Sequence, residues 1–256
     1  MRLISPEIVP SALEILREEE LNEARAIQGA MLPMESLHIG KITVAHRMRP
    51  VHEVGGDFLD YFKLSDQTVG VYLGDVAGKG LPAALYAALV VGTLRGVDKT
   101  GRSPADVLSL LNKRLCMRAI PSRYAAVLYA VFDPKTSEMH ISSAGMHGPL
   151  HLSRQGCHDL HLSGLPPGMF PNTEYDTSVL KLEPGDSLVF MTDGIAELRQ
   201  QNADDSTLGH LIDVCAKHAA FSPACLLDAM FAAADQHMGE EPQHDDMAAA
   251  VFHFAK

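Results

Sequence analysis

The chain has 256 residues, of which 46% are hydrophobic and 21% are charged, and its formal net charge is −11. This length and apolar content suffice for one large domain with a substantial core. The acidic balance, without any run of Lys and Arg, offers no electrostatic surface to nucleic acid or anionic lipid, so we expect neither partner. The four cysteines lie far apart, which indicates neither a disulfide framework nor a thiolate zinc site and favours a cytoplasmic location.

The N-terminal part of the chain predicts a helix. Its first residues carry prolines and acids where a signal peptide needs an apolar run, and no apolar stretch of the chain is long enough to cross a bilayer. Residues 12–32 are rich in helix formers. Their apolar stripe consists of Leu13, Leu16, Ala24, Ile27 and Met31. Glu20 and Glu23 interrupt the stripe, so a helix packed on its own domain is expected at least as strongly as a coiled coil.

The remainder of the chain alternates between short β-rich runs and helical patterns. Strands are predicted at residues 41–48, 58–64, 68–74, 124–132, 138–144, 186–192 and 247–254. Helices are predicted at residues 81–95, 103–117, 208–218 and 223–238. Short turns such as SDQT and DPKTSE join most neighbouring strands, which indicates antiparallel hairpins. The pattern therefore predicts an α+β layered sandwich.

The first hairpin predicts a close pair of carboxylates. Asp57 follows two glycines in GGDFLD, and Asp75 ends the run TVGVYLGD. Each lies nine positions from Asp66 at the centre of the expected turn, so a symmetric register sets them opposite one another. Directly paired positions have Cα atoms roughly 4.5 to 5.5 Å apart. Two carboxylates that close repel unless one is protonated or a cation lies between them.

The same arrangement occurs again near the C-terminal end. Asp193 follows the strand DSLVFMT, and Asp245 precedes the strand MAAAVFHF. If the sheets stack, all four acids converge on one edge. Oxygen ligands without His or Cys suit a hard cation, Mg²⁺ or Mn²⁺. Any one of these motifs alone is more often a turn than a ligand, and it is the hairpin symmetry and the recurrence that favour a metal site.

Several motifs occur in the order found in metal-dependent protein phosphatases of the PPM type. They are GGDFLD, GDVAGKGLPAAL, SAGMHGPL, GLPPGMF, GDSLVFMTDGIAEL and HDDMAAAVF, preceded by ARAIQGAMLP. The chain resembles the bacterial SpoIIE-like or RsbU-like branch over about residues 21 to 254. The resemblance implies a four-layer αββα sandwich of two antiparallel β-sheets flanked by helices. It divides the chain into an N-terminal helical linker or regulatory segment, residues 1–35, and a phosphatase domain, residues 36–256.

The resemblance also implies a centre with two Mn²⁺ or Mg²⁺ ions. Asp57 resembles a ligand of one ion, Asp75 the bridging ligand, and the carbonyl of Val76 a further ligand of the first ion. Asp193 and Asp245 resemble the carboxylates that hold the second ion. Asp60 and Asp246 match further acidic positions of this branch, where we expect contact with the metals through water or through other residues.

The chain departs from its eukaryotic relatives in two places. Those enzymes carry a histidine two residues beyond the bridging aspartate, where this chain has Ala77, with Lys79 close by. Their phosphate-binding arginine has only approximate counterparts here, Arg47 and Arg49. The proton donor to the leaving group is therefore unassigned, with solvent as the default.

Other features have simpler explanations. GGDF also occurs in diguanylate cyclases, but the following Glu is missing here and the downstream motifs do not fit that family. The pairs His147/His151 and His158/His161 could suggest zinc. On a strand, however, four residues separate two side chains by roughly 13 Å, which favours surface or packed histidines. Asp204 and Asp205 are expected in a solvated loop, with substrate recognition as the lesser alternative.

These observations predict a metal-dependent serine/threonine protein phosphatase that hydrolyses phosphoserine or phosphothreonine on a protein. By resemblance, its substrate is a small regulator such as the anti-sigma factor antagonist of a partner-switching pathway. The first rival is a catalytically silent binding module of the same fold. A second, a calcium-binding regulatory domain, lacks the spaced ligand loop of a calcium hand. The N-terminal helix adds the hypothesis of a homodimer, or of control by a partner.

Overall fold

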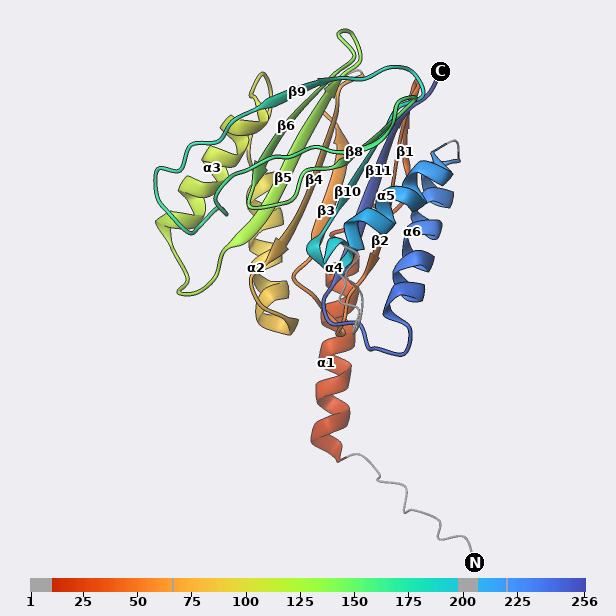
Figure 1. Ribbon diagram of the computed structural model, residues 1–256. Helices are drawn as coiled ribbons and strands as arrows, with labels where there is room; N and C mark the ends of the chain where they lie inside the picture. Colours follow the sequence, from red (N-terminus) through yellow and green to blue (C-terminus); the bar gives the residue numbers. More distant parts are fainter. Residues whose placement is uncertain (1–10, 66, 198–206, 220) are drawn as a thin grey trace, which may run out of the picture.

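The structure is a computed structural model, which describes residues 11–65, 67–197, 207–219 and 221–256. Two antiparallel β-sheets pack face to face, and helices cover the outer face of each sheet (Figure 1). The expected α+β sandwich of four layers is therefore confirmed.

The two sheets are built from segments that lie far apart in the sequence. The six-stranded sheet has the order β1 (Leu37–Ile39), β2 (Ile42–Arg49), β11 (Met247–Phe254), β10 (Ser187–Met191), β7 (Leu150–Ser153) and β8 (Gly156–Asp159). The five-stranded sheet has the order β3 (Phe58–Lys63), β4 (Val69–Val76), β5 (Ala125–Asp133), β6 (Glu138–Ala144) and β9 (Ser178–Lys181). Strands from both ends of the chain are thus neighbours in one sheet.

Each helix layer belongs to one sheet. Helices α2 (Gly80–Arg95) and α3 (Pro104–Met117) pack on the five-stranded sheet. Helices α5 (Thr207–His218) and α6 (Pro223–Met238) pack on the six-stranded sheet, and the short α4 (Asp193–Ala196) follows β10. Helix α1 (Ala12–Gly29) projects away from the sandwich at one end (Figure 1). At α3, Ser103 and Asp106 form a capping box and Pro104 begins the helix.

Strand alternation produces three apolar layers. On β3, Leu59 and Tyr61 point into the core between the sheets, whereas Phe58 and Phe62 point toward α2 and α3. A third cluster, which includes Phe231, lies between the six-stranded sheet and α5 and α6. Both faces of the central strands are covered, so the sequences of β4, β10 and β11 are nearly continuous apolar runs.

Helix α1 differs from the favoured expectation of a helix packed along its own domain. The side chains of Leu13 and Ile27 are 76% and 69% exposed, so most of the apolar stripe faces outward. Only the end of the helix and the residues just after it meet the domain, through Gln28, which is buried, and Leu32, which packs against the central core. That expectation was therefore wrong for the first turns of α1.

The predicted strands and helices are all present, with ends shifted by a few residues. Four short strands, β1, β7, β8 and β9, and the four-residue α4 were not predicted. Each is too short to establish a periodic pattern. No helix among the described residues is both long and apolar enough to cross a membrane.

Candidate metal centre

The β3–β4 hairpin has the register that its sequence symmetry predicts. Phe58 pairs with Gly74 and Asp60 pairs with Tyr72, so the positions one step beyond the ladder are Asp57 and Asp75. Asp57 and Asp75 lie two residues from Leu59 and Leu73, which face the other sheet, so strand alternation places both acids on the same inter-sheet side of the five-stranded sheet. Both carboxylates therefore lie at one end of the sandwich, between the sheets.

The other two predicted ligands reach the same end from the six-stranded sheet. Asp193 begins α4 directly after β10, and Asp245 lies just before β11, which pairs with β10 in antiparallel register. A hydrogen bond ties the two sheets together there, because the Thr192 hydroxyl donates to Oδ2 of Asp57 over 2.8 Å. Thr192 is itself fully buried and accepts a hydrogen bond from the backbone N–H of Ala248.

The acids act on one another electrostatically. Burial, followed by the charge of Asp75, raises the pKa of Asp57 well above its usual range. Burial, followed by the charges of Asp193 and Asp245, raises the pKa of Asp75 to about 7. Burial and the charge of Asp245 also raise the pKa of Asp193. The fold thus gathers the four sequence-predicted carboxylates into one strained anionic group.

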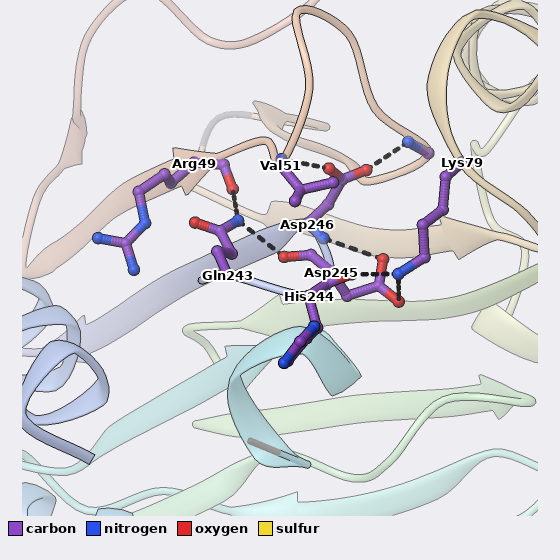
Figure 2. Close-up of polar contacts among 8 residues, drawn as sticks. Arg49, Val51, Lys79, Gln243, His244, Asp245 and Asp246 are labelled. Carbon is purple, nitrogen blue, oxygen red and sulfur yellow. Dashed lines mark hydrogen bonds and ion pairs between the residues drawn. The ribbon is translucent and has the colours of Figure 1, made fainter. Parts of the chain in front are cut away.

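One face of this group opens into a cavity of about 370 Å³, lined by Lys79, Asp193, Glu197, Glu241, His244 and Asp245. Lys79 lies at its rim, and its ammonium nitrogen is 2.9 Å from Oδ2 of Asp245 (Figure 2). The same nitrogen donates to the carbonyl of His244. A substrate that enters this cavity meets Asp193 and Asp245 directly.

Asp246 supports the centre through the backbone. It is 3% exposed, and its two oxygens accept hydrogen bonds of 2.7 Å from the N–H groups of Val51 and Gly56 (Figure 2). Gln243 joins the same segment to β2, because its amide donates to the carbonyls of Arg49 and Asp245. Asp246 therefore holds the backbone at Val51 and Gly56, and its contact with the metals through water or other residues stays a prediction.

Glycine is required at positions 55 and 56 because neighbouring atoms lie too close to the backbone to leave room for a side chain. A Cβ on Gly55 would lie 2.1 Å from Oδ2 of Asp246, so no larger residue fits without displacing that carboxylate. A Cβ on Gly56 would lie 3.0 Å from Oδ1 of Asp75 and 3.0 Å from the carbonyl oxygen of Val76. Those two oxygens, both predicted ligands, therefore converge beside the Gly56 backbone.

The oxygen set fits a hard divalent cation. Oδ1 of Asp57 is buried and has no hydrogen-bond partner within the described part of the chain, although an unpaired buried carboxylate oxygen is costly. Together with Oδ1 of Asp75 and the Val76 carbonyl, it supplies ligands of the kind that Mg²⁺ and Mn²⁺ prefer. Among the described residues, no group of three or more His, Cys, Asp or Glu side chains is already spaced to hold a metal ion. Mutual repulsion of the carboxylates opposes such spacing in the absence of a cation.

The structure corrects the expectation for Asp60. Asp60 lies two residues from both Phe58 and Phe62, so it shares their face of β3, toward α2, and does not lie between the sheets. Its Oδ2 forms an ion pair with Arg95 at 2.8 Å and accepts a hydrogen bond from the Tyr72 hydroxyl. Arg95 also donates to the carbonyl of Met31. Asp60 therefore joins β3, β4, α2 and the segment after α1, and does not reach the cluster.

The approximate arginine counterparts are also engaged elsewhere. Arg47 and Arg49 form ion pairs with Asp228 and Asp235 of α6, and both guanidinium groups lie over the ring of Phe231. They hold α6 against β2 and are not directed at the carboxylate cluster.

The histidine pairs are surface or packed residues, as expected. His151 pairs with buried Asp186, and His147 is 60% exposed and lies 3.2 Å from Glu197. Register places His158 opposite His151 in the β7–β8 hairpin, and His161 is almost fully exposed. Asp204 and Asp205 lie outside the described residues.

Two residues that support the carboxylate cluster, Thr192 and Gln28, were not predicted from the sequence. Thr192 directly precedes a predicted ligand, and that adjacency is the only sequence signal for its bond to Asp57. Gln28 hydrogen-bonds to Gly55 across 27 positions, for which the sequence holds no periodic signal.

Comparisons with known proteins agree with this architecture. A model of the family described as "Stage II sporulation protein E (SpoIIE)" matches residues 65–255. Phosphoserine phosphatase RsbU of Bacillus subtilis is 29% identical over 194 residues, covering 74% of this chain and 56% of the relative. Protein IcfG of Synechocystis is 27% identical over 70% of this chain and 33% of its own length. The chain thus spans about half or less of the length of these curated relatives.

Solved structures show the same fold. The SiaA-PP2C domain of Pseudomonas aeruginosa superposes with a TM-score of 0.83 at 21% identity, covering 95% of this chain and 98% of that one. RsbX in complex with magnesium gives a TM-score of 0.63 at 14% identity, covering 85% and 98% of the two chains. With the family model matching residues 65–255, the chain belongs to the SpoIIE family.

Proposed function

We propose that this protein is a metal-dependent serine/threonine protein phosphatase. The observation that carries the proposal is the convergence of Asp57, Asp75, Asp193 and Asp245 at one end of the sandwich, with an unpartnered buried oxygen on Asp57. Burial, followed by the charges of neighbouring acids, raises the pKa values of Asp57, Asp75 and Asp193, and a bound cation would remove the cost of holding these carboxylates together. A relative named as a phosphoserine phosphatase supports the reaction class.

The proposed mechanism assigns the ligands as follows. Asp57 and the Val76 carbonyl would hold the first ion, Asp75 would contribute to both, and Asp193 and Asp245 would hold the second. When bound there, two such ions would supply an activated water and would stabilise charge on the phosphoryl oxygens.

The protein's own groups orient these ligands. Thr192 fixes the carboxylate of Asp57 by its hydrogen bond, and Asp246 fixes the backbone before Asp57. Lys79 places a positive charge at the rim of the cavity, where a phosphate monoanion or dianion enters. No protein nucleophile is required, and the proton donor to the leaving group is unassigned, with solvent as the default.

The test measures Mn²⁺-dependent hydrolysis of an aryl phosphate. Asp75→Asn and Asp193→Asn should each abolish turnover while the far-UV circular dichroism stays unchanged. Asp228→Asn, which removes a carboxylate that is 72% exposed on α6, is the control and should keep full activity. Undiminished turnover in either cluster variant would defeat the assignment.

The rivals predict different outcomes. A silent binding module of this fold would bind Mn²⁺ or a protein without any turnover, and a calcium-binding domain would prefer Ca²⁺ in calorimetric titration. Either outcome replaces the enzyme by the corresponding rival. Retention of all four mutually repelling carboxylates favours the enzyme.

We propose a phosphorylated protein as the substrate, and within that class a small regulator such as an anti-sigma factor antagonist. The relatives RsbU and RsbP, both named phosphoserine phosphatases, support a phosphoserine substrate. Incubation with candidate phosphorylated regulators, with and without chelator, tests reaction, metal and specificity together. A cytoplasmic location is part of this proposal and is supported by four free cysteines.

We further propose residues 36–256 as the catalytic domain and residues 1–35 as a regulatory segment that forms a homodimer through α1. The exposed side chains of Leu13, Leu16 and Ile27 support a helix that acquires a partner. Replacing Leu16 and Ile27 by Glu should convert a dimer to a monomer in sedimentation. Identical monomers before and after the substitution would remove the dimer.

A further inference from the structure

The last turn of α1 is bonded directly to the turn that presents Asp57. The side-chain amide of Gln28 donates to the carbonyl of Gly55 over 2.7 Å and accepts from the N–H of Gly55 over 3.0 Å. Both polar groups of one backbone residue are therefore satisfied by one side chain, as they would be by a neighbouring β-strand. One turn earlier, Arg25 donates to the carbonyl of Glu53.

The burial of Gln28 sets it apart from the rest of the helix. Gln28 is 8% exposed, whereas Ile27 beside it is 69% exposed. An amide is costly to bury unless its hydrogen bonds are made, and an apolar side chain would serve better if packing alone were needed. The polar side chain faces the domain while the apolar side chain faces outward, which is the reverse of an ordinary packed helix.

Gly55 is the backbone residue through which this contact reaches the ligands. Its α-carbon lies against Asp246, since a Cβ there would be 2.1 Å from Oδ2 of that carboxylate. The next N–H, of Gly56, donates to the same oxygen, and the Gly56 α-carbon lies beside Asp75 and Val76. A displacement of Gly55 would therefore move the backbone that carries Asp57 and the packing around Asp75.

We propose that Gln28 is a positioning residue of the metal centre: by holding both backbone groups of Gly55, the end of α1 fixes the Gly55–Gly56–Asp57 turn in its metal-binding geometry. This inference rests on the proposed metal site. It makes the end of α1 a structural part of that site.

The chemistry requires glutamine at this position. Glu could accept from the Gly55 N–H but could not donate to its carbonyl, and it would add a negative charge near Asp246. Met has nearly the same shape and flexibility but makes neither hydrogen bond. Gln28→Met therefore removes the two hydrogen bonds while keeping the packing, and Arg25→Met does the same to the exposed neighbouring contact.

The experiment titrates Mn²⁺ into the full chain by calorimetry. Gln28→Met should raise the Mn²⁺ dissociation constant by roughly 10- to 100-fold, as loss of a group that supports a metal ligand typically does. Arg25→Met should raise it by no more than about threefold, because that hydrogen bond is accessible to water. Gln28→Glu should also bind Mn²⁺ more weakly than the wild-type protein. Circular dichroism and the midpoint of urea unfolding, both in chelator, establish that each variant is folded.

Each outcome decides between the two proposals. If the wild-type protein binds Mn²⁺ and folded Gln28→Met binds it equally well, the positioning role is overturned and the phosphatase proposal stands. If the wild-type protein binds no Mn²⁺, both are overturned. If Gln28→Met does not fold, hydrogen exchange of the wild-type Gly55 amide decides: protection supports the contact, and exchange as fast as in an unstructured peptide overturns it.

Discussion

Replacing Asp75 by Asn should stabilise the protein in the presence of a chelator. Burial and the charges of Asp193 and Asp245 raise the pKa of Asp75 from 3.8 to about 7. The folded state then binds this proton more tightly than the unfolded state, so the stability of the chelated protein falls as the pH rises from about 4 to about 7. Asn has a similar shape and no charge, and it removes this cost.

The magnitude follows from the shift. One pKa unit corresponds to about 1.36 kcal/mol, so about three units set an upper limit near 4 kcal/mol. The side chain of Asp75 keeps some contact with water, and its charge interacts with those of neighbouring acids, so the real gain should be below this limit. We expect a gain of about 1–3 kcal/mol in the free energy of unfolding above about pH 7. The gain should shrink steadily toward about pH 4, where Asp75 is protonated in both states.

Urea unfolding in chelator at several pH values between about 5 and 8 measures the gain. Excess Mn²⁺ should reverse the order of stability, since a ligand at 100 times its dissociation constant stabilises by about 2.7 kcal/mol and the variant lacks the bridging carboxylate. Asp228→Asn, on the surface of α6, should change stability by less than about 1 kcal/mol without this pH dependence. A gain that is absent, or equal at all pH values, would refute the electrostatic reasoning.

Three further substitutions test the supports of the site. Thr192→Val should lower the free energy of unfolding by about 1–3 kcal/mol in urea, because it removes the buried hydroxyl that donates to Asp57. Gly55→Ala should lower the thermal midpoint and weaken Mn²⁺ binding, whereas Gly29→Ala, in open space, should be neutral or stabilising by up to about 1 kcal/mol. Asp246→Asn should cost about 1–3 kcal/mol in urea unfolding, since one backbone N–H then faces another donor. Wild-type stability of any of these three variants would contradict the contact it tests.

The β3–β4 hairpin was predictable because local rules determine it. A single turn centre fixes which residues pair, and strict alternation then sets Asp57 and Asp75 on one face. The same alternation, applied to Asp60, would have excluded it from the cluster, because Asp60 and Asp57 have opposite parity on one strand. The wrong expectation for Asp60 came from family resemblance, which indicates which positions correspond but does not indicate in which direction a side chain points.

Contacts between elements distant in sequence were not predictable. The Gln28–Gly55 hydrogen bonds depend on the angle at which α1 leaves the domain, and no pattern within either segment encodes that angle. Arg47 and Arg49 resembled phosphate ligands by position, but their direction is set by the carboxylates of α6, a helix near the other end of the chain. The sequence thus indicated the strand ends that carry the clustered carboxylates, and packing determined which residues support them.

The place of β11 in the sheet has a consequence for biosynthesis. This strand lies between β2 and β10, and the hydrogen bond from Gly56 to Asp246 beside it spans 190 positions. At about 5–20 residues per second on the ribosome, roughly 10–40 s pass between synthesis of these two residues. During that interval the nascent chain carries Asp57 and Asp75 without their partners, so the carboxylate cluster is incomplete until the last strand has emerged.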